Sequence, residues 1–309
     1  MKIAVIGPGA MGLLYGAKLS KCADVVLVGN NAEHVKEIND NGITLIREGT
    51  ETVYHVPAVL SGRVEEPADL VILFTKAYLT EEALGQNKTL IGPNTVLLTL
   101  QNGAGHEEVL SKFAEKKKIL IGTTGQGSYR ENAHTIVNSG LGDTAIGVIS
   151  DEFTGIEEIG KVFEQSGFPC EISDNIRRMV WNKLMINASS SVLSGVLGVN
   201  QGYVVENGYA WEICKDLIRE ICRTATGEGY PFDEEEQIER IANHLKNAPG
   251  GYTSIYADLK NGRKTEVDYI SGSVVRAAER QGKTVPTQAL MVRMVHAMED
   301  RDTSEREKR

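Results

Sequence analysis

A glycine pattern near the N-terminus constrains this chain more than any other feature. Gly7, Gly9 and Gly12 follow a short β-branched run at 2–6 and precede a segment with helical periodicity at 10–21. In that context the first glycine permits a tight turn, the second lets the backbone approach a pyrophosphate, and the third lets helix and strand pack closely. The pattern predicts a dinucleotide-binding loop, formed by Gly7, Pro8, Gly9, Ala10, Met11 and Gly12. A glycine-rich turn without a ligand is the alternative.

The first half of the chain alternates strand-like and helix-length segments. A second strand candidate at 25–28 completes a βαβ unit, and the later candidates are 70–75, 95–101, 119–124 and 144–149. Their near-continuous apolar runs are typical of strands covered on both faces. We therefore expect a Rossmann-like, doubly wound sheet of class α/β, with antiparallel hairpins within 122–149 at its end.

After a last strand-like piece at 170–172, the pattern becomes helical. Helices are predicted at 175–195, 210–228, 234–247 and 267–281, and one more after Pro286. A length of 309 residues fits two domains. The prediction is a dinucleotide-binding domain at 1–174 and an all-α, substrate-binding C-terminal domain at 175–309.

Composition and charge narrow the classes of partner. The net charge of −9 disfavours nucleic acid and anionic membrane surfaces. No apolar run reaches the roughly 20 residues that cross a bilayer, and the N-terminus lacks the apolar core of a secretory signal. The four cysteines and six histidines show no spacing typical of metal ligands, so we expect no metal, free thiols and a cytoplasmic location.

Two clusters of polar residues lie in the helical half. Lys183, Asn187 and Ser191 are spaced one helical turn apart between apolar neighbours. A solvated stripe is the alternative for them. Ser254 shares a helix face with Asp258, and Glu266 is expected to open the next helix, where a carboxylate would also stabilise the helix N-terminus.

Taken together, these motifs resemble the ketopantoate reductase family over nearly the whole chain. The resemblance rests on the glycine pattern and on four further motifs that occur in the family's order. They are Thr75-Lys76-Ala77, Gln101-Asn102-Gly103, Trp181-x-Lys183-x-x-x-Asn187, and Ser254 with Asp258 and Thr265-Glu266-Val267-Asp268.

The resemblance implies a role for each matching residue. Lys183 would be the proton donor, and Glu266 would position the lysine and the substrate and also lie beside the cofactor. Asn187, Ser191, Ser254 and Asn102 would bind substrate, with Asn102 also beside the nicotinamide. Lys76 would contact the adenosine end of the cofactor, next to Asn30 and Asn31.

The chain departs from the family at three places. Ser191 stands where a second asparagine is usual, Gly251 stands where an asparagine is often found, and Asn30 and Asn31 replace an arginine after the second strand. No acidic residue follows that strand to hold a ribose hydroxyl. The resemblance and this absence predict NADP (NADPH) as the cofactor, and NAD stays open.

The leading functional hypothesis is the NADPH-dependent reduction of 2-dehydropantoate to pantoate, on the route to pantothenate and coenzyme A, in a cleft between the domains. Reduction of a different 2-keto acid is the second hypothesis, since Ser191 and Gly251 depart from the family. A noncatalytic protein that senses NADP is the third. A homodimer formed through the helical domain is an open expectation.

Overall fold

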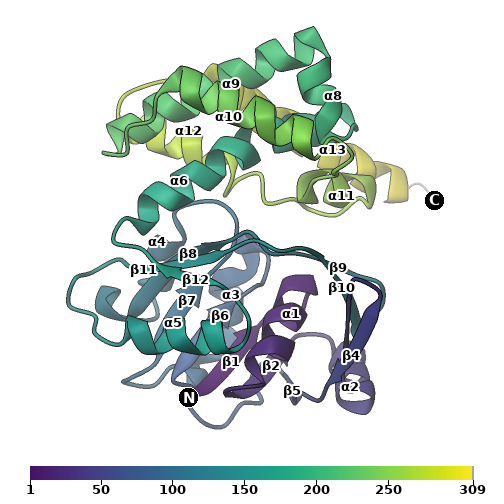
Figure 1. Cartoon of the computed structure of the whole chain (residues 1–309), viewed down its shortest axis with the longest axis vertical. Helices are drawn as coiled ribbons and strands as arrows, with labels where there is room; N and C mark the ends of the chain where they lie inside the picture. The colour runs from purple at the N-terminus through teal and green to yellow at the C-terminus, as the bar shows by residue number, and fades with distance from the viewer. Residues whose placement is uncertain (308–309) are drawn as a thin grey trace. The chain divides into compact units, whose positions relative to one another are not determined.

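The computed structural model describes residues 1–307, with side chains through Arg301, and divides into two compact units (Figure 1). The first unit contains Met1–Gln101 and His106–Met179. The second contains Asn102–Gly105 and the chain from Val180 onward. The chain passes between units inside helix α6 (Ile176–Ile186), and the four-residue segment that follows Gln101 belongs to the second unit.

The large sheet of the first unit confirms the predicted doubly wound fold. Among the described residues it has 8 strands, and only the pairing of β11 with β8 is antiparallel. In sheet order the strands are β12 (Cys170–Ile172), β11 (Thr144–Val148), β8 (Ile119–Thr124), β7 (Val96–Thr99), β6 (Leu70–Leu73), β1 (Lys2–Ile6), β2 (Asp24–Gly29) and β5 (Ala58–Leu60). The order reverses between β1 and β6, which is the place where open α/β sheets bind ligands.

Side-chain alternation along the strands divides the apolar core of this unit into two layers. Ile3 and Val5 of β1 pack in one cluster, while Ala4 and Ile6 pack in the other. The first layer includes side chains of α1 (Ala10–Leu19), α2 (Ala32–Asn41) and α5 (Ile156–Gln165). The second includes side chains of α3 (Thr80–Gln86) and α4 (His106–Leu110). Helices therefore cover both faces, as the apolar strands predicted.

A second, smaller sheet is the part of this unit that we did not predict. Its strands, in order, are β4 (Thr50–Tyr54), β3 (Ile43–Arg47), β10 (Thr135–Gly140) and β9 (Gly127–Arg130). The expectation that all of 122–149 forms hairpins at the end of the large sheet is wrong for β9 and β10. They pair with each other and join the β3–β4 hairpin, whose two-residue turn has positive φ at both Glu48 and Gly49.

The second unit is helical, as expected, but two predicted helices differ from the structure, one by an interruption and one by its start. The helix expected over 175–195 is α6, a π-helical segment Asn187–Ser191, and α7 (Val192–Leu197). The helix expected from 267 begins at Ser271. The other helices are α8 (Gln201–Glu206), α9 (Gly208–Gly227), α10 (Glu234–Asn247), α11 (Ser254–Lys260), α12 (Ser271–Arg280) and α13 (Pro286–Glu307).

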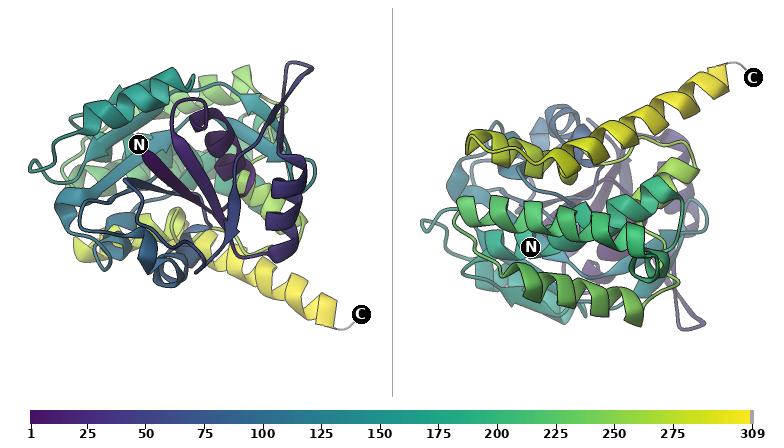
Figure 2. Two further views of the ribbon diagram at one scale, coloured as in Figure 1. Left: turned by 90° about the horizontal axis from the view of Figure 1, so that it is seen from below. Right: turned by 90° about the horizontal axis from the view of Figure 1, so that it is seen from above.

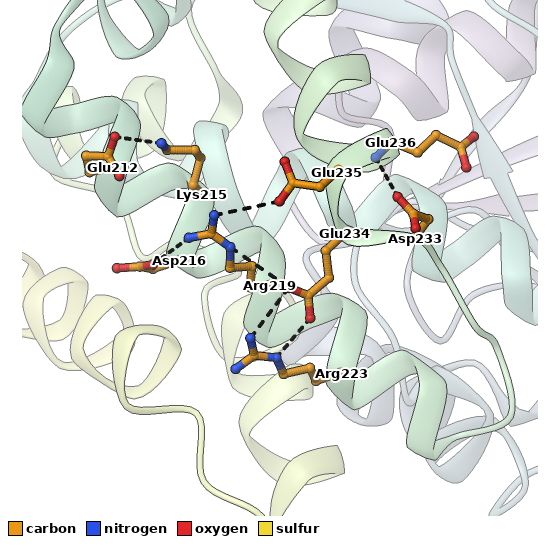
Figure 3. Close-up of polar contacts among 9 residues, drawn as sticks. All are labelled: Glu212, Lys215, Asp216, Arg219, Arg223, Asp233, Glu234, Glu235 and Glu236. Atoms are coloured by element: carbon orange, nitrogen blue, oxygen red, sulfur yellow. Dashed lines mark hydrogen bonds and ion pairs between the residues drawn. The ribbon is translucent and has the colours of Figure 1, made fainter.

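Helix α9 is the centre of this unit. It contacts α10 and α13, which lie on either side of it (right view of Figure 2). Its inner face buries Cys214, Leu217, Ile218 and Ile221. On the outside, Arg219 and Arg223 reach Glu234 at the start of α10, with Arg223 Nε 2.9 Å from the carboxylate (Figure 3). Exposed pairs of this kind contribute little, so apolar burial is what holds the helices together.

None of the described helices combines the length and the apolar character that crossing a membrane would require. The described cysteines are all free thiols.

The glycine loop generates a stability prediction with an internal control. A Cβ on Gly12 would lie 2.1 Å from the Gly7 carbonyl oxygen, whereas a Cβ on Gly9 would meet no atom within 4 Å. We expect Gly12→Ala to lower the free energy of unfolding by about 1–3 kcal/mol, because main-chain atoms must move. Gly9→Ala should leave it within about 0.5 kcal/mol. Urea titration of both variants measures the difference, and equal stabilities would contradict the contact.

Candidate functional site

The glycine loop in the first unit has the geometry that a pyrophosphate needs. Gly7 has φ +95°, and a Cβ on it would lie 2.6 Å from the Thr75 amide nitrogen, so the loop runs directly against the chain after β6. Gly12 packs on the carbonyl of Gly7. The space beside Gly9 is open. The first and third glycines therefore shape the loop, and the second leaves its outer side clear.

Helix α1 begins at this loop with no side chain capping it. Gly9 occupies the N-cap, and the first intrahelical bond runs from the Leu13 amide to the Gly9 carbonyl at 2.9 Å. The amides of Ala10, Met11 and Gly12 precede that bond, so they have no acceptor within the helix. With the positive end of the helix dipole, they form a cradle that fits a phosphate group.

The segment after β2 uses one of its two asparagines to cap a helix. Asn31 is the N-cap of α2, and its Oδ1 accepts a hydrogen bond from the His34 amide at 2.9 Å. Asn30 is exposed beside it. Pro8 packs on the end of β2, because a Cβ on Gly29 would lie 3.0 Å from the proline ring. Both asparagines thus lie at the same strand edge as the glycine loop.

Gln101 organises the loop that carries Lys76, a role that the sequence analysis missed. Its Nε2 donates to the Thr75 carbonyl at 2.7 Å and to Thr80 Oγ1 at 2.9 Å, while its Oε1 accepts from Thr99 Oγ1 at 2.8 Å. The side chain is almost fully buried. This network fixes the turn after β6 against the end of β7. The only available signal was the Gln101-Asn102-Gly103 motif, from which we assigned a role to Asn102 alone.

Asn102 lies in the short segment that belongs to the second unit. The Ala104 amide donates to the Tyr269 carbonyl at 3.0 Å. Gly103 has φ +99°, and a Cβ on it would lie 2.1 Å from the same carbonyl oxygen. The Tyr269 amide in turn donates to the Glu266 carbonyl at 2.9 Å. Two residues far apart in sequence, Asn102 and Glu266, are therefore attached to one turn of the backbone.

Lys183 and Glu266 lie close enough to interact electrostatically. Burial lowers the pKa of Lys183 to about 8, and the charge of Glu266 acts in the opposite direction. Glu266 itself is 8% exposed. We had expected Glu266 to open a helix, and this expectation is wrong. Its carbonyl closes a turn with the amides of Tyr269 and Ile270, and α12 starts only at Ser271.

A π-helical segment changes the spacing expected for Asn187 and Ser191. The expectation of a regular one-turn spacing assumed an α-helix, and the segment Asn187–Ser191 is wider. Ser189 Oγ donates to the Met185 carbonyl, and Ser190 Oγ donates to the Ile186 carbonyl at 3.3 Å. These serines satisfy carbonyls next to the irregular turn, which is a structural role.

Ser191 and Ser254 differ in exposure. Ser191 is 8% exposed, and its Oγ accepts from Gln201 Nε2 at 3.3 Å. Ser254 is exposed at the first position of α11, while the neighbouring Thr253 caps that helix and donates to the Ser191 carbonyl at 3.2 Å. Asn187 is partly exposed at the start of the π segment. The cap of α11 thus connects the Ser254 region to the helix that carries Lys183.

His296 of α13 braces the turn around Glu266. Its Nε2 lies 2.9 Å from Asp268 Oδ1, and its Nδ1 lies 2.9 Å from Glu299 Oε2. Glu299 also accepts from the Thr265 amide at 2.7 Å. Burial acts to lower the pKa of His296, but the hydrogen bonds and charges of the two carboxylates outweigh it and raise the pKa. Only the protonated ring can donate to both carboxylates at once.

This brace predicts a pH dependence of stability. Because the folded-state pKa of His296 is raised above its ordinary 6.5, its contribution is complete below that value and is lost as pH rises through the folded-state pKa. As pH rises from about 6.5 through the folded-state pKa of His296, we expect the melting temperature of the wild type to fall relative to that of His296→Gln. The exposed His55 gives a control, His55→Gln, which should track the wild type. Parallel curves for the wild type and His296→Gln would contradict the brace.

Comparison with known proteins identifies the family of the chain. Residues 3–151 match the family model described as ketopantoate reductase PanE/ApbA, and residues 175–299 match that of its C-terminal part. Curated 2-dehydropantoate 2-reductases from Lactococcus lactis and Pyrococcus horikoshii are each 30% identical, over 97% of this chain and 98% of theirs.

Solved structures are also similar to this chain. D-mandelate dehydrogenase, in a ternary structure with NADH and anilino(oxo)acetate, has a TM-score of 0.93 and 31% identity, covering 98% of this chain and 99% of the other. A PanE/ApbA family ketopantoate reductase from Ralstonia eutropha has a TM-score of 0.88 and 26% identity, covering 98% of this chain and all of the other. Both family models together cover most of the residues, and on that basis this chain belongs to the ketopantoate reductase family.

Proposed function

We propose that this protein reduces 2-dehydropantoate to pantoate with NADPH, in the cytoplasm. The observation that carries the proposal is the second unit's pairing of a lysine of lowered pKa with a nearly buried carboxylate, in a family whose curated relatives are named 2-dehydropantoate 2-reductases. The glycine loop and the open N-terminus of α1 support dinucleotide binding. A noncatalytic NADP-sensing protein would have no need of the Lys183–Glu266 pair.

In this proposal the reduced nicotinamide supplies the hydride when bound. The residues of the chain bind and orient the substrate and neutralise the charge that forms on it. A keto carbon that accepts hydride leaves negative charge on its oxygen, and Lys183 Nζ gives that oxygen a proton. A pKa of about 8 keeps most of the lysine protonated at neutral pH while making the proton easier to release than from an ordinary lysine. Solvent then returns a proton to the amine.

Glu266 is proposed as an orienting residue. Its charge favours the protonated form of Lys183, so it opposes the lowering of the pKa and holds the ammonium in place. Asn102 is attached to the same turn through Gly103 and Tyr269, which supports a role beside the reacting groups. Asn187, Ser191 and Ser254 are proposed to bind polar groups of the substrate, with the exposed Ser254 hydroxyl the most accessible of the three.

Three observations favour a second candidate, the reduction of another 2-keto acid with NADH. No cation follows β2, Asn31 is already used to cap α2, and D-mandelate dehydrogenase, which binds NADH, matches with a TM-score of 0.93. A 2′-phosphate would depend on Asn30, backbone amides and Lys76. Such an arrangement is weaker than bidentate recognition by arginine.

Steady-state kinetics with two coenzymes and two keto acids tests the proposal. We expect the highest kcat/KM for 2-dehydropantoate with NADPH. The comparison substrate is the 2-keto acid formed by oxidising mandelate. A higher kcat/KM with NADH or with the aromatic keto acid would favour the second candidate, and dinucleotide binding without turnover of either acid would favour a noncatalytic protein.

Lys183→Ala provides the sharpest test of the mechanism. Turnover should fall by about 100-fold or more, while the dissociation constant for NADPH changes little, because the residue acts in proton transfer. In the wild type, kcat should decrease as pH rises above about 8, since the donor must be protonated. Lys161→Ala, at an exposed position on α5, is the matched control. Wild-type turnover in Lys183→Ala would refute the assignment.

Substrate contacts give a separate prediction. Ser254→Ala and Asn187→Ala should each lower kcat/KM by roughly 5- to 150-fold, because a polar substrate group loses its partner. This change corresponds to a loss of about 1–3 kcal/mol of transition-state stabilisation. Titration of the substrate at saturating coenzyme measures kcat and KM separately. If both constants are unchanged in both variants, the substrate pocket lies elsewhere.

The assembly state is a further part of the proposal. We propose a homodimer through the helical unit, supported by apolar side chains exposed on its surface, including Tyr209 and Ile213 on one face of α9. Sedimentation of the purified chain measures the mass directly.

A further inference from the structure

A hollow in the first unit lies at the far end of α1 from the glycine loop. It has a volume of about 260 Å³. The residues that line it come from the end of α1 and from the small sheet; they are Lys18, Lys21, Leu45, Arg47, Glu48, Thr50, Thr52, Tyr54 and Asn138. Because α1 has ten residues, the hollow is about 15 Å along the helix from the dinucleotide loop. None of these residues has a role in the proposed reaction.

Strand register explains why so many polar groups face the hollow. In the β3–β4 hairpin Leu45 lies opposite Thr52, and Arg47 lies opposite Thr50. Side chains two residues apart share a face, so Tyr54 lies on the same side as Thr50 and Thr52. One face of the hairpin thus presents a guanidinium, two hydroxyls and a phenol toward the end of α1.

Lys18 is the unusual member of this set. It is 8% exposed, its Nζ donates to the Gly167 carbonyl at 2.6 Å, and it lies 3.8 Å from the centre of the Phe168 ring. The charged groups that act on it, Arg47 and Lys21, are both cations. Burial first and these like charges second lower the pKa of Lys18 to about 8. A buried ammonium is costly unless an anion accompanies it.

The charge balance around the hollow is opposite to that of the whole chain. Three cations line it with one carboxylate, Glu48, which is 3.8 Å from Arg47 and mostly exposed. The chain as a whole carries a net charge of −9. The negative end of the α1 dipole accounts for a cation there. The helix dipole does not account for an arginine and two threonines on the facing strands.

We propose that this hollow binds a phosphate group, carried by a small metabolite or free in solution. Arg47 would supply a planar pair of donors, and Lys18 and Lys21 would supply point charges. Thr50, Thr52 and Tyr54 add hydroxyl donors. A phosphate monoester carries close to two negative charges at neutral pH, which matches the excess of two cations over carboxylates. The site is independent of the proposed reductase activity.

Equilibrium dialysis with radiolabelled inorganic phosphate tests this site. The double variant Arg47→Gln, Lys21→Gln removes two charges from exposed positions, and Lys161→Gln removes one charge outside the hollow as a control. We expect the double variant to bind phosphate at least about tenfold more weakly than the wild type, with the control unchanged. Any phosphate held by the glycine loop is common to all three proteins, so the difference isolates the hollow.

A second measurement locates the bound anion. Phosphate should shift the backbone amide NMR signals of Thr50 and Thr52 saturably, whereas chloride at equal ionic strength should not. Identical phosphate binding by the wild type and the double variant would overturn the proposal, as would shifts at the hairpin that chloride reproduces. Tighter binding of a phosphorylated metabolite than of free phosphate would identify the metabolite as the natural source.

Discussion

Close approach of main chain to main chain at three glycines is the constraint on which the candidate residues of each unit depend. Gly7 lies against the chain after β6, Gly12 lies against the Gly7 carbonyl, and Gly103 lies against the Tyr269 carbonyl. In each case a methyl group would overlap main-chain atoms, which cannot move as a flexible side chain can. The first two contacts shape the dinucleotide loop, and the third attaches Asn102 to the turn that carries Glu266.

The doubly wound sheet could be predicted because its signals are local. The glycine pattern, the apolar strand at Leu70–Leu73 and the helices that follow several of the strands are all visible within short windows. The small sheet could not be predicted in that way, since β3 pairs with β10 from about 90 residues away along the chain. A local signal for half of it was present: Glu48-Gly49 lies between alternating residues, which is a hairpin pattern.

The candidate site shows the same division between local and distant information. The family motifs predicted Lys183 and Glu266 as site residues, and in the fold burial lowers the pKa of the lysine. The π segment was not predictable from spacing, because its freed carbonyls are satisfied by serine hydroxyls that fit a regular helix equally well. Gln101 and His296 act through partners distant in sequence, so neither could be recognised without the fold.

The cap of α2 ties coenzyme choice to the folding of the dinucleotide domain. The Asn31 side chain holds the first turn of the helix that follows β2, so an exchange to arginine at that position would remove a cap that typically contributes about 1 kcal/mol. Asn30 does not cap the helix, and it is exposed. A substitution that favours tighter 2′-phosphate recognition would therefore cost less stability at residue 30 than at residue 31, whether it arises by evolution or by engineering.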